Sequence, residues 1–297
     1  MSEQRERERL AGTDAAFWAG GAAKETPSPR RYVCHRASSP LRIDGRLDEA
    51  AWRAAPWTDV FLDIEGEKRP APRFRTRAKM LWDDRYFYVG ACMEEPHLSA
   101  TLTEHDAIVF HDNDFEIFID PDGDRKMYYE IEVNAFGTIF DLLLEKTYRD
   151  GGPARHEWLL PGMRHAVHLD GTVNDPSDAD RGWSVEFALP WKSLAEKAGK
   201  MACPPRDGDA WRVNFSRVQW RYRVENGKYV KEPGPEDNWV WSPQFEVNMH
   251  VPEKWGYVEF RRDGRPTPPP PAASARRSRA SSPPPCAPGA ALSHRPR

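Results

Sequence analysis

Three glutamates near the middle of the chain could act together in catalysis. Glu116 lies in the run FEIFID, and Glu130 and Glu132 lie in the following run MYYEIEVN. Paired carboxylates roughly 5 to 9 Å apart are what glycoside hydrolysis uses. A general acid, however, needs a raised pKa, and a glutamate on a solvated sheet face has no cause for one. No nucleophile motif accompanies these glutamates, so the sequence predicts a chain that is not an enzyme.

A second group of carboxylates could hold a metal ion. Asp120, Asp122 and Asp124 alternate around a glycine in the run Asp-Pro-Asp-Gly-Asp, an arrangement of oxygens that suits calcium. The run lacks the glutamate that closes an EF-hand loop, and an ordinary hairpin turn explains it equally well. Asp44, Asp48 and Glu49 form a second, weaker cluster. Calcium is therefore an expected structural cofactor, with a plain turn as the alternative.

The elements that must position these groups are short strands. Runs of β-branched and aromatic residues recur between Gly, Asp, Asn and Pro, which is typical of an all-β antiparallel sandwich. The expected strands are RTRAKMLW, RYFYVGACM, FEIFID, MYYEIEVN, TIFDLLLE, RHAVHL, WSVEFALP, WRVNFSRVQW and WGYVEF, with hairpin turns at Asp83-Asp84 and at PDGDRK. One short helix is expected at WKSLAEKA, which follows Pro190 and ends before Gly199.

Alternation along these strands separates a core face from a polar face, because successive side chains point to opposite sides of a sheet. The predicted core residues are Phe115, Ile117, Ile119, Tyr129, Ile131, Val133, Val185, Phe187, Leu189, Trp211, Val213 and Phe215. The predicted polar surface carries Glu116, Glu130, Glu132, Asn134, Glu186, Arg212, Asn214 and Ser216.

A sugar ring needs an aromatic platform with planar hydrogen-bonding groups beside it, and the polar face offers such groups. The candidate sugar-binding residues are Phe110, Glu116, Glu132, Asn134, Asn214, Arg217 and Trp220. The alternative for Glu116 is an ordinary solvated carboxylate. The alternatives for the asparagines, the arginine and the tryptophans are turn, strand-pinning and core roles.

The charge and composition of the chain limit the classes of partner that it is expected to bind. The net charge of −3 gives the 297-residue chain no overall electrostatic attraction to nucleic acid or an anionic membrane. The start MSEQRERERL lacks the apolar stretch of a signal peptide, so the chain as written is expected to be cytoplasmic.

The four cysteines lack zinc-ligand spacing and are expected to be free thiols, with a Cys34–Cys92 bridge as the alternative. The expected domains are a disordered leader at 1–30, a sandwich at 31–261 and a disordered tail at 262–297, in a monomer.

Six segments in order resemble the family 9 carbohydrate-binding modules. The first is Leu41-Arg-Ile-Asp-Gly-Arg-Leu-Asp-Glu-Ala-Ala-Trp52, and the others are AKMLWDDRYFYVGACMEEP, HDNDFEIFIDPD, YYEIEVNAFG, GWSVEFALPW and HVPEKWGYVEF. The resemblance implies a sandwich of two antiparallel sheets that binds glucan or xylan sugars without catalysis. It also implies a role accessory to glycoside hydrolases in carbohydrate catabolism, structural calcium, and export of most members.

The resemblance also implies particular site residues. Glu116 matches the family's sugar-binding glutamate, and Phe110 falls where the family has an aromatic residue before that motif. The sequence departs from the family at two points, because Glu132 replaces an arginine and Met249 lies where a second stacking tryptophan is expected. Trp239, Trp241 and Trp255 are near enough in sequence to supply a replacement stacking face.

Two other functions remain open. The two departures favour a structural or interaction domain that has lost sugar binding. The sandwich is also similar to DOMON-type cytochrome domains that hold haem b, and Met249 and His250 are haem-ligand types. Adjacent residues of an extended segment face opposite ways, so these two cannot bind one iron without a bulge, and no haem is expected.

Overall fold

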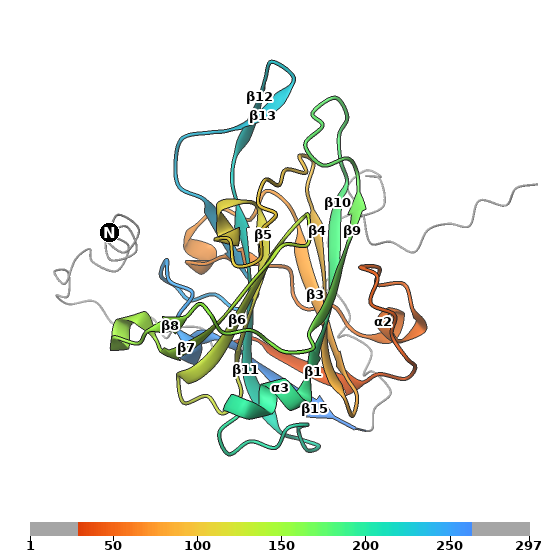
Figure 1. Ribbon diagram of the computed structural model, residues 1–297, viewed down its shortest axis with the longest axis vertical. Coiled ribbons are helices and arrows are strands. Elements are labelled where there is room, and N and C mark those ends of the chain that lie inside the picture. Colours follow the sequence, from red (N-terminus) through yellow and green to blue (C-terminus); the bar gives the residue numbers. More distant parts are fainter. Residues whose placement is uncertain (1–28, 263–297) are drawn as a thin grey trace, which may run out of the picture.

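The computed structural model describes residues 29–262 and contains mostly β-strands. The predicted disordered tails lie almost entirely outside these residues. The strands that form the body of the molecule (Figure 1) are β1 (Arg31–Arg36), β3 (Thr76–Trp82), β4 (Tyr86–Glu94), β5 (Asp114–Asp120), β6 (Lys126–Asn134), β7 (Ile139–Lys146), β9 (Arg164–Asp170), β10 (Gly182–Pro190), β11 (Ala210–Gln219) and β15 (Gly256–Arg261). All nine strands expected from the sequence are present, within about two residues of their predicted ends.

Shorter elements complete the described part of the chain. The strands are β2 (Leu62–Asp63), β8 (Ala154–Arg155), β12 (Tyr222–Glu225), β13 (Lys228–Lys231) and β14 (Asp237–Val240). The helices are α2 (Ala50–Ala54) and α3 (Trp191–Leu194), and the 3-10 turns are η1 (Gly66–Lys68), η2 (Val109–His111), η3 (Tyr148–Asp150), η4 (Ala195–Lys197) and η5 (Pro252–Lys254). The expected helix is thus confirmed as α3 and η4, whereas α2 was not predicted. No helix among the described residues is long and apolar enough to cross a membrane.

The main sheet follows one curled path that forms both layers of the sandwich, and β12 and β13 form a separate two-stranded sheet. The strand order of the main sheet is β8-β7-β6-β5-β11-β15-β1-β3-β4-β10-β9, with β14 paired to β11 and β2 paired to β14. The two expected hairpins, β3–β4 and β5–β6, are antiparallel. β1 runs parallel to both β15 and β3, which departs from the all-antiparallel expectation. Parallel pairing is possible there because long stretches of chain separate β1 from both partners.

The core lies between the two halves of the curled sheet. All twelve core residues predicted from alternation are buried in one cluster that also includes residues of β3, β4 and β15. Aromatic rings fill the end of the core next to α3. There Trp191 packs against Trp82, Phe87, Trp211 and Phe260, with ring centroids 5.5 to 6.4 Å apart. The sandwich predicted from the sequence is therefore confirmed.

The other face of the β5-β6-β7-β11 half is also covered. Phe118, Tyr128, Phe140, Leu142 and Leu144 form a second buried cluster with Val109 of η2 and with Trp255, which follows η5. Asn214 of β11 holds the overlying chain, since its amide donates to the Ser242 carbonyl and accepts from the Ser242 amide, both at 2.9 Å. The expectation of a solvated polar face is therefore wrong, because the 241–255 segment lies over it.

The first sequence motif is attached to the sheet through one glutamate. Glu186 of β10 accepts hydrogen bonds from the backbone amides of Asp44 and Gly45 and from the Trp52 indole, at 2.9, 2.8 and 2.6 Å. Gly45 has a φ of 84°, and a Cβ there would lie 2.4 Å from the backbone nitrogen of His168. The motif therefore needs glycine at this position, and Glu186, expected on the polar surface, is fully buried.

Two cysteines follow the sequence-based expectation and a third does not. Cys34 and Cys203 are free thiols, which excludes a Cys34–Cys92 bridge. Cys92 is disulfide-bonded, so the expectation of a free thiol is wrong there. Cys286 lies outside the described residues.

Candidate functional site

A cleft of about 700 Å³ lies beside β14. It lies where β2, η1 and the segment before β3 approach the segment that leads into β14. Its polar lining is Asp63, Glu65, Arg69, Arg73, Arg221, Glu236, Asp237 and Asn238, and its apolar lining is Ile64, Pro70, Ala71, Pro235, Trp239 and Val247. Alternating polar and apolar groups of this kind suit a ligand with both hydroxyls and apolar patches.

A smaller pocket of about 200 Å³ shares part of this lining. Arg73 and Arg221 border both hollows, and both donate to Asp237, at 2.9 and 3.1 Å. The smaller pocket is otherwise lined by Phe74, Glu95, His97, Gln219, Trp220, Tyr222 and Glu232. We call the two hollows together the groove. The β12–β13 hairpin, which projects from the top of the molecule in Figure 1, contributes Tyr222 to the smaller hollow.

The charges that border the larger hollow largely neutralise one another. Arg69 pairs with Glu65, and Arg73 and Arg221 share Asp237. The carboxylates of Asp63 and Glu236 form no ion pair within residues 29–262, and burial raises the pKa of Asp63 above its ordinary value. The larger hollow, with four carboxylates against three guanidinium groups, is therefore close to neutral, which favours an uncharged polar ligand there. The smaller hollow adds the carboxylates of Glu95 and Glu232.

Arg217 supports the groove from below. Its side chain is 1% exposed and donates to Glu95 and Thr76 at 3.0 Å and to Gln219 at 2.9 Å. Glu95 and Gln219 in turn line the smaller pocket. Arg217 thus orients groove residues but lacks the exposure to reach a ligand itself.

The predicted tryptophans differ in position. Trp239 and Trp220 both border the groove, but Arg73 and Arg217 lie over the Trp239 ring at 5.6 and 5.2 Å, and Lys231 lies 3.9 Å from the Trp220 ring centre. Trp255 lies elsewhere, buried between Phe118 and Tyr128. Trp241 is fully buried in the main core. The prediction of an exposed replacement stacking face is therefore not met by Trp241 or Trp255.

The predicted polar sugar ligands share one face but lie below the surface. Glu116 pairs with Glu132 and with Ser216 in register, and Asp114 pairs with Asn134. Asn134 donates to Leu102 and Asp112 and accepts from the amides of Phe136 and Thr138, so it organises the turn after β6. Asn214 is occupied by Ser242. The assignment of these side chains to sugar binding stays a prediction, but their expected exposure is wrong.

Burial raises the pKa values of the carboxyl groups on this face. Burial raises the pKa of Glu116 to about 7, and it raises the pKa values of Asp114 and Glu132 well above their ordinary range, with the Glu116 charge adding to both. The expectation that such glutamates keep ordinary pKa values is wrong, because it assumed a solvated face. None of the three lines the groove. Phe110, half-buried, lies next to this group and donates its backbone amide to Glu132 at 3.1 Å.

The β5–β6 turn brings its three aspartates together. Asp120, Asp122 and Asp124 each place one carboxylate oxygen within 4.8 Å of the others. Both oxygens of Asp120 already accept backbone amides, from Gly123 at 3.0 Å and Arg125 at 2.9 Å, and burial raises its pKa to about 7. These hydrogen bonds fit the plain turn, while the clustered oxygens fit calcium, so a calcium ion here stays a prediction.

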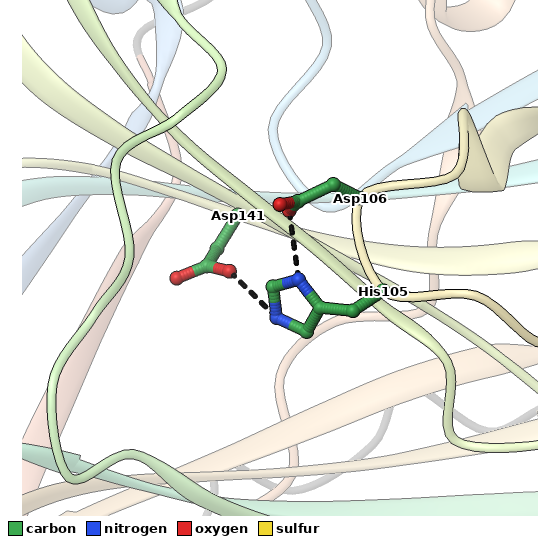
Figure 2. A group of neighbouring side chains, drawn as sticks. All are labelled: His105, Asp106 and Asp141. Carbon is green, nitrogen blue, oxygen red and sulfur yellow. Dashed lines mark ion pairs between the residues drawn. The ribbon is translucent and has the colours of Figure 1, made fainter.

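A further cluster was not predicted from the sequence. Figure 2 shows His105 between two aspartates, with Nδ1 3.0 Å from Asp106 and Nε2 3.4 Å from Asp141. Asp141 is 1% exposed, and burial raises its pKa while His105 opposes the rise. Each imidazole nitrogen already faces a carboxylate. An ion-paired contact between the loop before β5 and strand β7 therefore explains the cluster.

The residues considered as haem ligands have other contacts. Met249 packs against the second buried cluster. His250 Nδ1 lies 3.0 Å from the Tyr128 hydroxyl. Nothing in these contacts favours the haem alternative over a packing role.

Known proteins resemble this chain in sequence. Residues 43–203 match the family described as carbohydrate family 9 binding domain-like. Exoglucanase XynX of Acetivibrio thermocellus is 27% identical over 152 residues, and endo-1,4-beta-xylanase A of Thermotoga maritima is 29% identical over 153 residues. Each match covers 51% of this chain but only 12% of the relative, so the chain matches about an eighth of the length of these enzymes.

Solved structures resemble its fold. A proposed carbohydrate-binding protein from Bacteroides uniformis superimposes with a TM-score of 0.57 at 16% identity, covering 79% of this chain and all of the other. A family 9 module from Caldicellulosiruptor kristjanssonii in complex with glucose gives 0.51 at 16% identity, covering 81% of this chain and all of the module. The family match spans more than half of the chain, and the chain belongs to the family 9 carbohydrate-binding domain-like proteins, a family of non-catalytic binding modules.

Proposed function

We propose that this chain is a non-catalytic carbohydrate-binding module that takes a neutral glucan- or xylan-type oligosaccharide in the groove. The observation that supports this most directly is the larger hollow of the groove, which is nearly neutral and is lined by polar and apolar groups, on a member of a carbohydrate-binding family. Paired guanidinium and carboxylate groups offer the planar donors and acceptors that sugar hydroxyls use.

The relatives support the class of sugar. The matched enzymes are an exoglucanase and a xylanase, of which the matching region is a small part, and the Caldicellulosiruptor module was solved with glucose. A role beside polysaccharide-degrading enzymes follows for this chain as part of the proposal. Catalysis is not part of it, because Glu116 and Glu132 are 5% and 2% exposed and lie outside the groove, away from any bound glycosidic bond.

The groove also sets the expected strength of binding. Cations lie over the rings of both tryptophans that border the groove, and Trp239 is only 3% exposed, so ring stacking adds little to the binding energy. The remaining hydrogen bonds compete with water. We expect dissociation constants of about micromolar to millimolar.

Titration calorimetry with glucose, cellobiose and xylo-oligosaccharides tests the proposal. Arg221→Ala removes one guanidinium from both hollows and should weaken binding about ten-fold, as expected for one charge-assisted hydrogen bond. Arg223→Ala is the matched control, because Arg223 lies on the same hairpin, is exposed and pairs with Glu225 outside the groove. Equal affinities for the wild type and both variants, or no binding of any of these sugars, would contradict the proposal.

A further inference from the structure

Trp220 is the tryptophan of the groove whose ring a ligand could reach. It follows directly after β11, lines the smaller hollow and is only partly buried. Its indole Nε1 donates to the Phe110 carbonyl at 2.8 Å, and its backbone amide donates to Oδ1 of Asn113 at 2.7 Å. These two hydrogen bonds to one neighbouring segment fix the plane of the ring. A fixed aromatic plane is what stacking on the apolar face of a sugar needs.

The ammonium group of Lys231 occupies the place on this ring where a sugar would stack. Lys231 is the last residue of β13, and its Nζ lies 3.9 Å from the centre of the Trp220 ring. Nζ also donates to the backbone carbonyl of His111, in the segment that fixes Trp220. The Lys231 side chain therefore joins the β12–β13 hairpin to η2 across the face of the ring.

The cation over Trp220 is held less firmly than the cations over Trp239. Trp239 is buried, and the cations over its ring are the buried Arg217 and Arg73, which forms an ion pair of its own. Lys231 is exposed, and its ammonium forms one hydrogen bond and no ion pair within residues 29–262. An exposed cation over an aromatic ring is only weakly attracted to it. A ligand can therefore displace Lys231, whereas buried contacts keep the Trp239 ring covered.

A nearby carboxylate can accept the displaced ammonium. Burial lowers the pKa of Lys231, and the charges of Asp112 and Glu236 oppose this decrease, so both carboxylates lie within electrostatic reach of Nζ. Asp112 is buried and already accepts hydrogen bonds from Thr101 and Asn134. Glu236 is only partly buried, lines the larger hollow and forms no ion pair in the described part of the chain. Rotation of the Lys231 side chain toward Glu236 would exchange the ring contact for an ion pair.

We propose that Trp220 is the sugar-stacking residue of the smaller hollow and that Lys231 is an intramolecular competitor, which the C–H face of a pyranose ring must displace. An ammonium group and a sugar face compete because both bind the same face of the ring. The inference rests on the proposed function and adds to it the residue that limits the affinity. Loss of one exposed cation–π contact and one hydrogen bond should weaken sugar binding by about three- to ten-fold.

Titration calorimetry of the full chain with cellobiose and xylo-oligosaccharides tests the inference. Lys231→Ala should bind about three- to ten-fold more tightly than the wild type, because it removes the competitor and leaves the ring in place. Lys231→Arg keeps a cation over the ring and should show no gain. Lys228→Ala is the matched control and should bind like the wild type, because Lys228 is an exposed lysine at the other end of β13, opposite Glu225. Adding Trp220→Leu to Lys231→Ala should cancel the gain, since no ring is left to uncover.

Quenching of tryptophan fluorescence by acrylamide measures the cover on the ring without any sugar. Lys231→Ala should be quenched more strongly than the wild type and Lys228→Ala, and adding Trp220→Leu should remove the difference. Equal quenching of these proteins, or wild-type sugar binding that Lys231→Ala leaves unchanged or weakens, would overturn the inference and leave the proposed function standing. Absence of sugar binding in the wild type and in every variant would overturn the proposed function, and the inference with it.

Discussion

Glu186→Gln is the substitution whose effect the structure defines most closely. The two carboxylate oxygens of Glu186 serve three buried donors, two backbone amides and the Trp52 indole. Glutamine keeps one acceptor oxygen, and its amide nitrogen must face either the indole or the backbone amides. Either the indole or the backbone amides then lack a hydrogen-bond acceptor, which lowers the free energy of unfolding by about 1 to 3 kcal/mol. The first sequence motif should therefore be held less tightly.

The size of this effect should depend on pH. Burial raises the pKa of Glu186 from 4.5 to about 7, against the opposing effect of the three donors. Because the folded pKa is the higher one, the unfolded chain loses its proton first, and this glutamate makes the wild type less stable as pH rises from about 4.5 to about 7. The full change corresponds to about 3 kcal/mol at most. Glutamine does not titrate, so the variant lacks this contribution.

Urea unfolding of both proteins at pH 5 and pH 8, followed by tryptophan fluorescence, measures the difference. We expect Glu186→Gln to be less stable than the wild type at pH 5 and the gap to narrow or close by pH 8. Glu67→Gln makes the same chemical change at an exposed position of η1 and should alter neither value. A gap that stays constant, or that widens toward pH 8, would refute the reasoning and show that the three donors keep Glu186 ionised.

Two further substitutions test contacts that hold the covering loops. Asn214→Ala should lower the free energy of unfolding by about 1 to 3 kcal/mol, because both backbone groups of Ser242 lose their buried partner. Urea titration checks this value, and an unchanged midpoint would show that water replaces the amide. Under acidic conditions in which histidine side chains are protonated, His105→Ala should lower the free energy of unfolding by about 1 kcal/mol, because buried Asp141 then loses a cationic neighbour whose exposed ring is partly screened by solvent. The loss should shrink in 1 M salt, and a loss independent of salt would point to packing instead.

The strands and the core were predictable because their signal is local. Alternation in runs such as FEIFID and WRVNFSRVQW requires only neighbouring residues, and it placed Ile117, Phe215 and the other predicted core residues correctly. The same alternation states which side of a strand a residue faces but not what lies over that side. Glu116 and Asn214 were assigned to the correct face and to the wrong environment, because Ser242 and the chain around it lie 28 positions beyond Asn214.

The groove was less predictable because distant segments build it. Arg73 and Asp237 form one of its central ion pairs across 164 positions, and neither lies in a run with strong periodicity. Trp220 and Trp239 were singled out as aromatic candidates, and they do border the groove. The covering of their rings by Lys231 and Arg73 depends on tertiary contacts that composition and spacing do not encode.

The departure at Glu132 explains why three buried carboxylates, those of Asp114, Glu116 and Glu132, lie close together on β5 and β6. The family resemblance places an arginine at this position, where a guanidinium would lie between strands that also carry Asp114 and Glu116 and would balance their charges. Glutamate instead adds a third carboxylate at a site that is 2% exposed. A buried face of one sign can persist only if protons or a cation neutralise it. Burial raises the pKa of Glu116 to about 7 and the pKa values of Asp114 and Glu132 well above their ordinary range, so bound protons supply this neutralisation.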